Sequence, residues 1–253
     1  MTDTLGHQRP STTSPGAPNS VGTRVLLACG IAAPVLNIVV LLVLGAIRPD
    51  YNPLVVPDSN LELGPGGWMQ ITNYIVTGLL LLAFGAGLRR VVPTGRGATW
   101  LSILLCAYAL TFVAIGPVLP DPSLGYPVGE PETLTVHGAV HSLLGIVQFG
   151  SLTAACFVLA GRDKARGKHG LARYSTVNGI LVAGTYIAFA LVAKLVEGGP
   201  AGLIERLGLI ACGSWIAVLA IRMMRRPTED QNGPSTFVGS QSPPASPRAR
   251  WSA

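Results

Sequence analysis

The sequence predicts an all-α integral membrane protein, a polytopic bundle of six transmembrane helices with both termini in the cytoplasm. Two observations predict this class: six long apolar runs, and intervening segments whose charge alternates in sign. Each run has about twenty residues or more, and a helix of that length crosses a hydrocarbon core of about 30 Å. Because backbone amides in lipid must be satisfied within the segment, the runs should be helical. Charged residues make up only 12% of the chain, well below the roughly 25% usual in soluble domains.

The charges predict how the bundle is oriented. Fifteen of the eighteen basic residues lie before the first run, between the second and third, between the fourth and fifth, or after the sixth: Arg9, Arg24, Arg89, Arg90, Arg96, Arg162, Lys164, Arg166, Lys168, Arg173, Arg222, Arg225, Arg226, Arg248 and Arg250. The other three loops hold only Arg48, Lys194 and Arg206, with eight of the twelve acids: Asp50, Asp58, Glu62, Asp121, Glu130, Glu132, Glu197 and Glu205. The positive-inside rule places the basic segments in the cytoplasm. A net charge of +6 spread over these loops does not indicate a nucleic-acid partner.

The apolar runs divide the chain into one domain and two tails. Residues 1–22 and 227–253 are rich in Ser, Thr, Pro and Gly, so we expect disordered cytoplasmic tails. Residues 23–226 form the transmembrane domain, with runs that start near Val25, Trp68, Thr99, Thr135, Tyr174 and Leu203. The two longest loops, near residues 48–67 and 118–134, are predicted to lie outside.

Polar side chains interrupt the first two runs. Pro34 predicts a kink in the first run, and Asn37 should find a partner on another helix. In the second run, Gln70, Asn73 and Thr77 fall within about 60° of one another on a helical projection. Such a polar face should point into the bundle rather than toward lipid.

The fourth run begins with the most specific local pattern in the chain, His137-Gly-Ala-Val-His141. Pro131 suits a first helical turn, so the helix is predicted to begin there. A spacing of four residues places both imidazoles on one face of the helix, and Gln148 continues that face into the membrane. The predicted topology brings Asp58 and Asp121, which flank neighbouring runs, to the same outer end.

Three interpretations of this outer cluster are open. The first is a polar pocket for a small ligand or for extracytoplasmic sensing, formed by Asp58, Ser59, Gln70, Asn73, Asp121, His137, His141 and Gln148. The second is a zinc site in which His137, His141 and Asp121 bind the metal and leave one position for water. The third is a hydrogen-bonded cluster in which a histidine pairs with Asp58 or Asp121 and ties an outer loop to the bundle.

The last two runs carry fewer polar groups. Ser175, Gly179 and Ala183 recur every four residues in the fifth run, a small-residue face that lets another helix approach closely. We expect this face to pack inside the bundle, with a homo-oligomer contact as the alternative. Ion pairing at the outer interface accounts for the charges that flank the last turn: Lys194, Glu197, Glu205 and Arg206. Aromatic residues near span ends, Tyr74 among them, are expected as interfacial anchors.

Several motifs together resemble a known bacterial family of six-span membrane proteins, catalogued as domain of unknown function 998. The motifs are Arg48-Pro-Asp-Tyr-Asn-Pro, Asp58-Ser-Asn-Leu, Gly66-Gly-Trp68, Pro120-Asp-Pro, His137-Gly-Ala-Val-His141 and, with Trp215 and Arg222 after it, Gly202-Leu-Ile-Glu-Arg206. The resemblance covers about residues 24–226 and implies a six-helix integral membrane fold. It also implies that Ser59, Asp121, His137 and His141 are the family's polar positions. It implies no activity.

These observations favour a non-enzymatic multi-pass protein of the bacterial inner (plasma) membrane, with the lipid bilayer and a small-molecule ligand as partners. The rival is a membrane-embedded metal-dependent hydrolase, loosely similar to the alkaline ceramidase and adiponectin-receptor group. That group uses a third histidine and seven helices, and this chain has no other His within an apolar run. A structural or transport-associated role is the further alternative, but no inverted repeat marks a transporter.

Overall fold

The computed structural model describes residues 20–92 and 94–225. These residues form six long helices and one short 3₁₀-helix: α1 (Val21–Ile47), η1 (Asp58–Glu62), α2 (Gly67–Val91), α3 (Arg96–Ile115), α4 (Val136–Ala165), α5 (His169–Leu195) and α6 (Ala201–Met224). All six long helices are long and apolar enough to cross a membrane. The prediction of an all-helical, six-span membrane protein is therefore confirmed. The predicted tails lie outside the described residues, apart from residues 20–22, of which 21 and 22 belong to α1.

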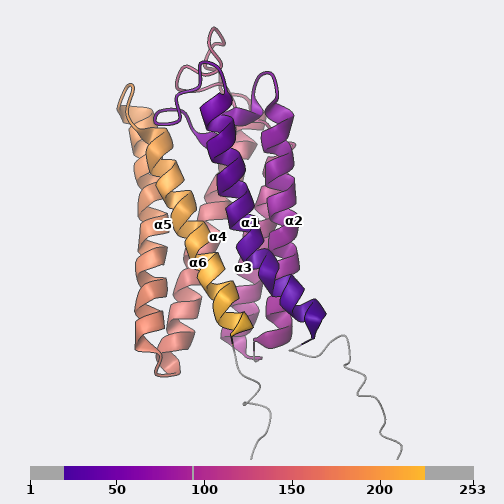
Figure 1. The fold of residues 1–253 in the computed structure, drawn as a ribbon. Coiled ribbons are helices and arrows are strands. Elements are labelled where there is room, and N and C mark those ends of the chain that lie inside the picture. Colours follow the sequence, from indigo (N-terminus) through magenta and orange to yellow (C-terminus); the bar gives the residue numbers. More distant parts are fainter. Residues whose placement is uncertain (1–19, 93, 226–253) are drawn as a thin grey trace, which may run out of the picture.

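The six helices form a ring in which each helix packs against the next one along the chain (Figure 1). α6 also packs against α1, and this contact closes the ring. Three of the connections are short, at residues 92–95, 166–168 and 196–200, as is usual between antiparallel neighbours. The two long loops, residues 48–66 and 116–135, lie at one end of the ring, where the 196–200 turn also lies.

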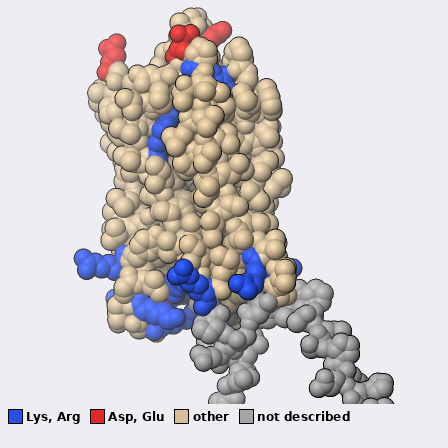
Figure 2. All heavy atoms as spheres, in the orientation of Figure 1, with Lys and Arg blue, Asp and Glu red and all other residues tan. Residues whose placement is uncertain are grey.

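The two ends of the ring carry opposite charge (Figure 2). Lys and Arg side chains gather at the end that holds the start of α1, the end of α6 and the connections 92–95 and 166–168, here called the basic end. Asp and Glu side chains are exposed at the opposite end, here called the acidic end. The positive-inside rule makes the basic end cytoplasmic, and this orientation stays a prediction.

Glycines let neighbouring helices approach closely. A Cβ added at Gly30 of α1 would lie 2.6 Å from a ring carbon of Phe84 on α2. A Cβ at Gly213 of α6 would lie 2.8 Å from Cβ of Pro34 on α1, at the contact that closes the ring. Larger side chains at these two positions would therefore push the helices apart.

The small-residue face of α5 packs within the bundle. Ser175 accepts a hydrogen bond from Nε1 of Trp215 on α6 at 3.1 Å. A Cβ at Gly179 would lie 3.1 Å from Cβ of Cys156 on α4. Since Ser175 and Gly179 are buried against neighbouring helices of the same chain, the face serves the packing inside the bundle that the sequence predicts.

Buried polar side chains hold the two long loops. Arg48, the residue after α1, donates hydrogen bonds to three backbone carbonyls between residues 61 and 65. Nδ2 of Asn60, in η1, donates to Oγ of Ser123 at 3.0 Å and to its carbonyl at 3.1 Å. Asn60 thereby ties the first long loop to the second.

Candidate functional site

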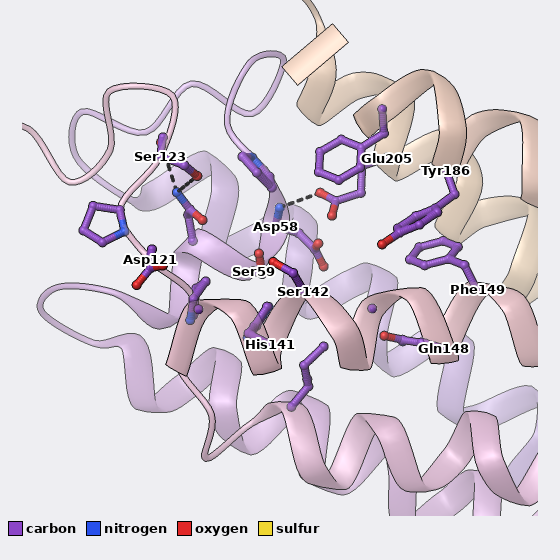
Figure 3. A pocket seen from close by; sticks show the side chains of 18 of the residues that line it. Asp58, Ser59, Asp121, Ser123, His141, Ser142, Gln148, Phe149, Tyr186 and Glu205 are labelled. Carbon is purple, nitrogen blue, oxygen red and sulfur yellow. Dashed lines mark hydrogen bonds between the residues drawn. The ribbon is translucent and has the colours of Figure 1, made fainter. Parts of the chain in front are cut away.

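A cavity of about 470 Å³ lies at the acidic end of the ring. Its walls come from α2, α3, α4, α5 and α6, and the two long loops and η1 complete it (Figure 3). Exposed residues of the second loop, among them Glu132 and Leu134, line its mouth. The volume lies within the range of about 300–1,000 Å³ that is usual for small-molecule sites.

Two carboxyl groups from distant parts of the chain meet at this cavity. Oε2 of Glu205, on α6, accepts the backbone N–H of Asp58 at 2.8 Å. Oδ2 of Asp58, at the start of η1, accepts the hydroxyl of Tyr74 at 2.9 Å. Asp58 and Glu205 are only 4% and 8% exposed, so both lie in surroundings where a carboxylate is poorly solvated.

The cation nearest to Glu205 in sequence is turned away from the cavity. Nη1 of Arg206 donates to the carbonyls of Val56 and Gly202, and Nη2 donates to the hydroxyl of Tyr51. Its guanidinium carbon lies 5.6 Å from the centre of the Tyr51 ring. Burial raises the pKa of Tyr51 well above its ordinary value, so its hydroxyl keeps its proton. Arg206 therefore fixes the first loop and does not line the cavity.

His141 is fixed in one tautomer by the loop that follows α3. Its Nδ1 lies 2.6 Å from the carbonyl oxygen of Val118. A carbonyl oxygen only accepts hydrogen bonds, so Nδ1 must carry a proton. In a neutral ring, Nε2 is then the nitrogen that remains able to accept a hydrogen bond.

Asp121 holds the residue that caps the start of α4. Its carboxylate accepts both the backbone N–H of Thr135 at 2.9 Å and the Thr135 hydroxyl at 2.6 Å. The hydroxyl oxygen of Thr135 accepts the N–H of Gly138 at 3.0 Å, so Thr135 is the N-cap. The prediction that this helix begins at Pro131 is wrong, because the cap that satisfies the first backbone donors lies at Thr135.

Aromatic side chains form the deeper wall of the cavity. The rings of Phe149 on α4 and Tyr186 on α5 are stacked, with centroids 4.5 Å apart. Phe112 of α3 and Tyr74 of α2 meet edge to face, with centroids 5.8 Å apart. All four residues line the cavity, with Gln148 beside Phe149. Acidic, amide and aromatic groups therefore border one space.

The cavity brings together five of the eight residues that the sequence predicts for a pocket: Asp58, Ser59, Asp121, His141 and Gln148. His137 does not line it and is exposed in the first turn of α4. Gln70 and Asn73 do not line it either; they are buried on α2, where Nδ2 of Asn73 donates to Oδ1 of Asn37 at 3.0 Å. The polar face of the second span thus points inward, but toward α1.

His137 and His141 do not converge with a third metal-binding side chain in the described parts of the chain. Across residues 20–92 and 94–225, no three His, Cys, Asp or Glu side chains come together as a metal site. Asp121, the third ligand of the zinc interpretation, uses both carboxylate oxygens to hold Thr135.

Glu62 is a buried carboxyl beside the cavity rather than in its wall. It is 4% exposed, and neither of its carboxyl oxygens has a hydrogen-bond partner among the described residues. Burial, and to a lesser degree the neighbouring charge of Asp58, raises the pKa of Glu62 to about 9. Glu62 is therefore protonated at neutral pH.

Glu205 is the main site residue that the sequence analysis did not predict. Its position beside Arg206 suggested an ion pair at the outer interface, whereas Glu205 is buried and lines the cavity. Tyr74, expected as an interfacial anchor, is likewise buried there. A signal was present, since a carboxyl within an apolar run should face the interior of the bundle.

The comparisons with known proteins identify a family without assigning an activity. The family model described as protein of unknown function (DUF998) matches residues 31–222. The chain therefore belongs to this family, which confirms the resemblance of its motifs. No curated protein and no solved structure gives a significant match.

Proposed function

We propose that this member of the family is a multi-pass protein of the bacterial plasma membrane whose cavity faces outward and takes up a small ligand. In this role it binds a molecule from the extracytoplasmic side or senses conditions there, and it is not an enzyme. The observation that carries the proposal is the cavity of about 470 Å³, into which Asp58, His141, Gln148 and Glu205 converge from three different elements, η1, α4 and α6.

The distribution of charge supports the outward direction. Arg89, Arg90 and Arg96 flank the connection between α2 and α3, and the connection between α4 and α5 is also basic. The cavity opens at the opposite end, among acidic loops. If the basic end is cytoplasmic, ligands enter the cavity from outside the cell.

A cavity-filling substitution tests this function while the ligand is still unidentified. Ser142 of α4 lines the cavity, while the next residue, Leu143, is exposed and does not. We suggest screening purified protein by thermal shift against a set of small cations, anions, neutral molecules and zinc, in parallel with Ser142→Phe and Leu143→Phe. A bound ligand stabilises the folded state. Ligands of the cavity should stabilise the wild type and Leu143→Phe, but not Ser142→Phe.

Two outcomes would contradict this proposal. If every stabilising compound acts equally on Ser142→Phe, binding takes place elsewhere. If zinc is bound in near-stoichiometric amount and lost in His141→Ala, the interpretation as a metal-dependent hydrolase replaces ligand uptake.

A further inference from the structure

We propose that the ligand is a small soluble organic cation, an amine that carries an aromatic or aliphatic group. This inference rests on the proposed function and names the chemical class that the cavity selects.

The charge of the lining is the first argument. Four carboxyl groups line the cavity, those of Asp58, Asp121, Glu132 and Glu205, and no Lys or Arg does. In residues 20–92 and 94–225, one ion pair joins an Arg or Lys to a carboxylate, and it lies at the basic end, between Asp163 and Arg222. The carboxyl groups of the cavity thus have no cationic partner of their own.

The lack of a cationic partner matters most for the two carboxyl groups that are buried. Asp58 and Glu205 interact directly and are each more than nine-tenths buried. Arg206 is near enough to attract both, but its hydrogen bonds go to Tyr51 and to backbone carbonyls. Two interacting carboxyl groups in such surroundings cannot both be ionised without a large cost. A cation that enters the cavity would relieve this cost and be held strongly, because little water screens the attraction.

The aromatic wall is the second argument. Phe149 and Tyr186 border the space that Asp58 and Glu205 also border (Figure 3). Ring faces attract cations through their quadrupole, more strongly where water is excluded. The same rings bury apolar groups. A ligand that joins an ammonium group to a hydrophobic group can therefore contact the carboxyl groups and the aromatic wall at the same time.

The lining also argues against an anionic or zwitterionic ligand. Phosphate and carboxylate groups are bound mainly by Arg, Lys and clustered backbone N–H donors, and the cavity has neither Arg nor Lys. The phosphate of an ethanolamine or choline lipid headgroup would meet the four carboxyl groups. The source of the amine is therefore a soluble molecule rather than a lipid.

Three probes that share one phenyl ring test this inference on the unaltered protein. Phenethylamine is a cation at neutral pH, 2-phenylethanol is its neutral counterpart, and 3-phenylpropionate is an anion. In calorimetric titrations of the full chain in an uncharged detergent, phenethylamine should bind at least about tenfold more tightly than the alcohol, and the anion should not bind. A short-chain phosphatidylethanolamine, as a fourth arm, should bind more weakly than phenethylamine.

Substitutions of the carboxyl groups test whether these groups bind phenethylamine. Glu205→Gln and Asp58→Asn should each weaken phenethylamine binding by about tenfold or more, because each removes a carboxyl group that can pair with the ammonium group. Glu197→Gln should leave it unchanged, since Glu197 is exposed on the turn between α5 and α6, outside the cavity. If either carboxyl variant fails to fold, the other and the probe series still decide the result.

The inference and the proposed function fail in different ways. If the alcohol or the anion binds as tightly as the amine, and Ser142→Phe abolishes that binding, the cavity takes up ligands but does not select cations. The inference is then overturned and the function stands. If none of the four probes binds at millimolar concentration, the inference is also overturned, and the unbiased screen decides the function. Phosphatidylethanolamine binding that exceeds phenethylamine binding would overturn the assignment to a soluble amine.

Discussion

Glu62 is a carboxyl that the fold keeps protonated. It has no hydrogen-bond partner among the described residues, and burial raises its pKa from about 4.5 to about 9. Unfolding therefore releases a proton between these two pH values. The wild type should lose stability as the pH rises through this window, since the folded state binds the extra proton.

The variant Glu62→Gln should remove this pH dependence. Its thermal midpoint should be close to that of the wild type near pH 5 and should exceed it increasingly toward pH 9. The gain there is expected to be on the order of a few kcal/mol. Thermal unfolding in detergent at about pH 5, 7 and 9 checks this, with the exposed Glu197→Gln as control. An equal difference between Glu62→Gln and wild type at every pH would disprove the protonated carboxyl.

At the residue scale, the sequence predicts polar positions better than their partners. Asp58, Asp121 and His141 are expected at the outer end, and they line one cavity. The sequence could not predict that His137 is exposed while His141 lines the cavity. This difference depends on where α4 begins and on the contact of His141 with Val118. The sequence also suggests an ion pair for Glu205, because Arg206 follows it, but the guanidinium bonds to Tyr51 and backbone carbonyls.

Among the elements, α4 depends most on a contact outside itself. A Cβ at Gly138 would lie 1.9 Å from a carboxylate oxygen of Asp121, which holds the N-cap Thr135. Gly138→Ala should displace Asp121 and release the cap, at a cost of about 1–3 kcal/mol. Gly150, on the same helix, has nothing within 4 Å of an added Cβ. Gly150→Ala should be neutral or stabilise by up to about 1 kcal/mol.

Thermal midpoints of the two alanine variants, measured side by side, check this prediction. Equal midpoints would mean that the contact between Asp121 and Thr135 contributes nothing to the start of α4. The comparison also separates the two roles of Asp121. If Gly138→Ala lowers stability but keeps ligand binding, Asp121 acts through the cap rather than through the ligand.

At the element scale, length and hydropathy are sufficient to predict six helices, because only a helix satisfies its own backbone in lipid. The start of α4 is not predictable in the same way. Pro131 favours a first turn locally, but the cap forms where Asp121, fourteen residues earlier than Thr135, reaches the chain. Contacts between residues distant in sequence decide where the helix begins.

The whole molecule is a closed ring, and the cavity is a consequence of its closure. The sequence predicts a pocket between the second and fourth spans. The cavity walls also include Tyr186 of α5, which stacks on Phe149 of α4, and Glu205 of α6. Glu205 meets Asp58 of the first loop because α6 packs back against α1. No local pattern indicates that contact. The opposite charge of the two ends of the ring, by contrast, is predictable, because the charged residues can be counted along the chain.

The central claim is that the cavity opens to the outside of the cell, and labelling of Ser142→Cys on intact cells tests it most directly. Lys168→Cys at the basic end and Glu197→Cys at the acidic end are the matched controls, since both positions are exposed. The wild type, with its four cysteines, gives the background. The cavity is acidic, so a positively charged, membrane-impermeant thiosulfonate should react faster at position 142 than a negatively charged one.

We predict that Ser142→Cys and Glu197→Cys are labelled on intact cells, and that Lys168→Cys is labelled only after permeabilisation. Labelling of Lys168→Cys alone would show that the bundle has the opposite orientation. Labelling of Glu197→Cys without Ser142→Cys would show that the cavity is closed to the outside, and either result would contradict the proposed function.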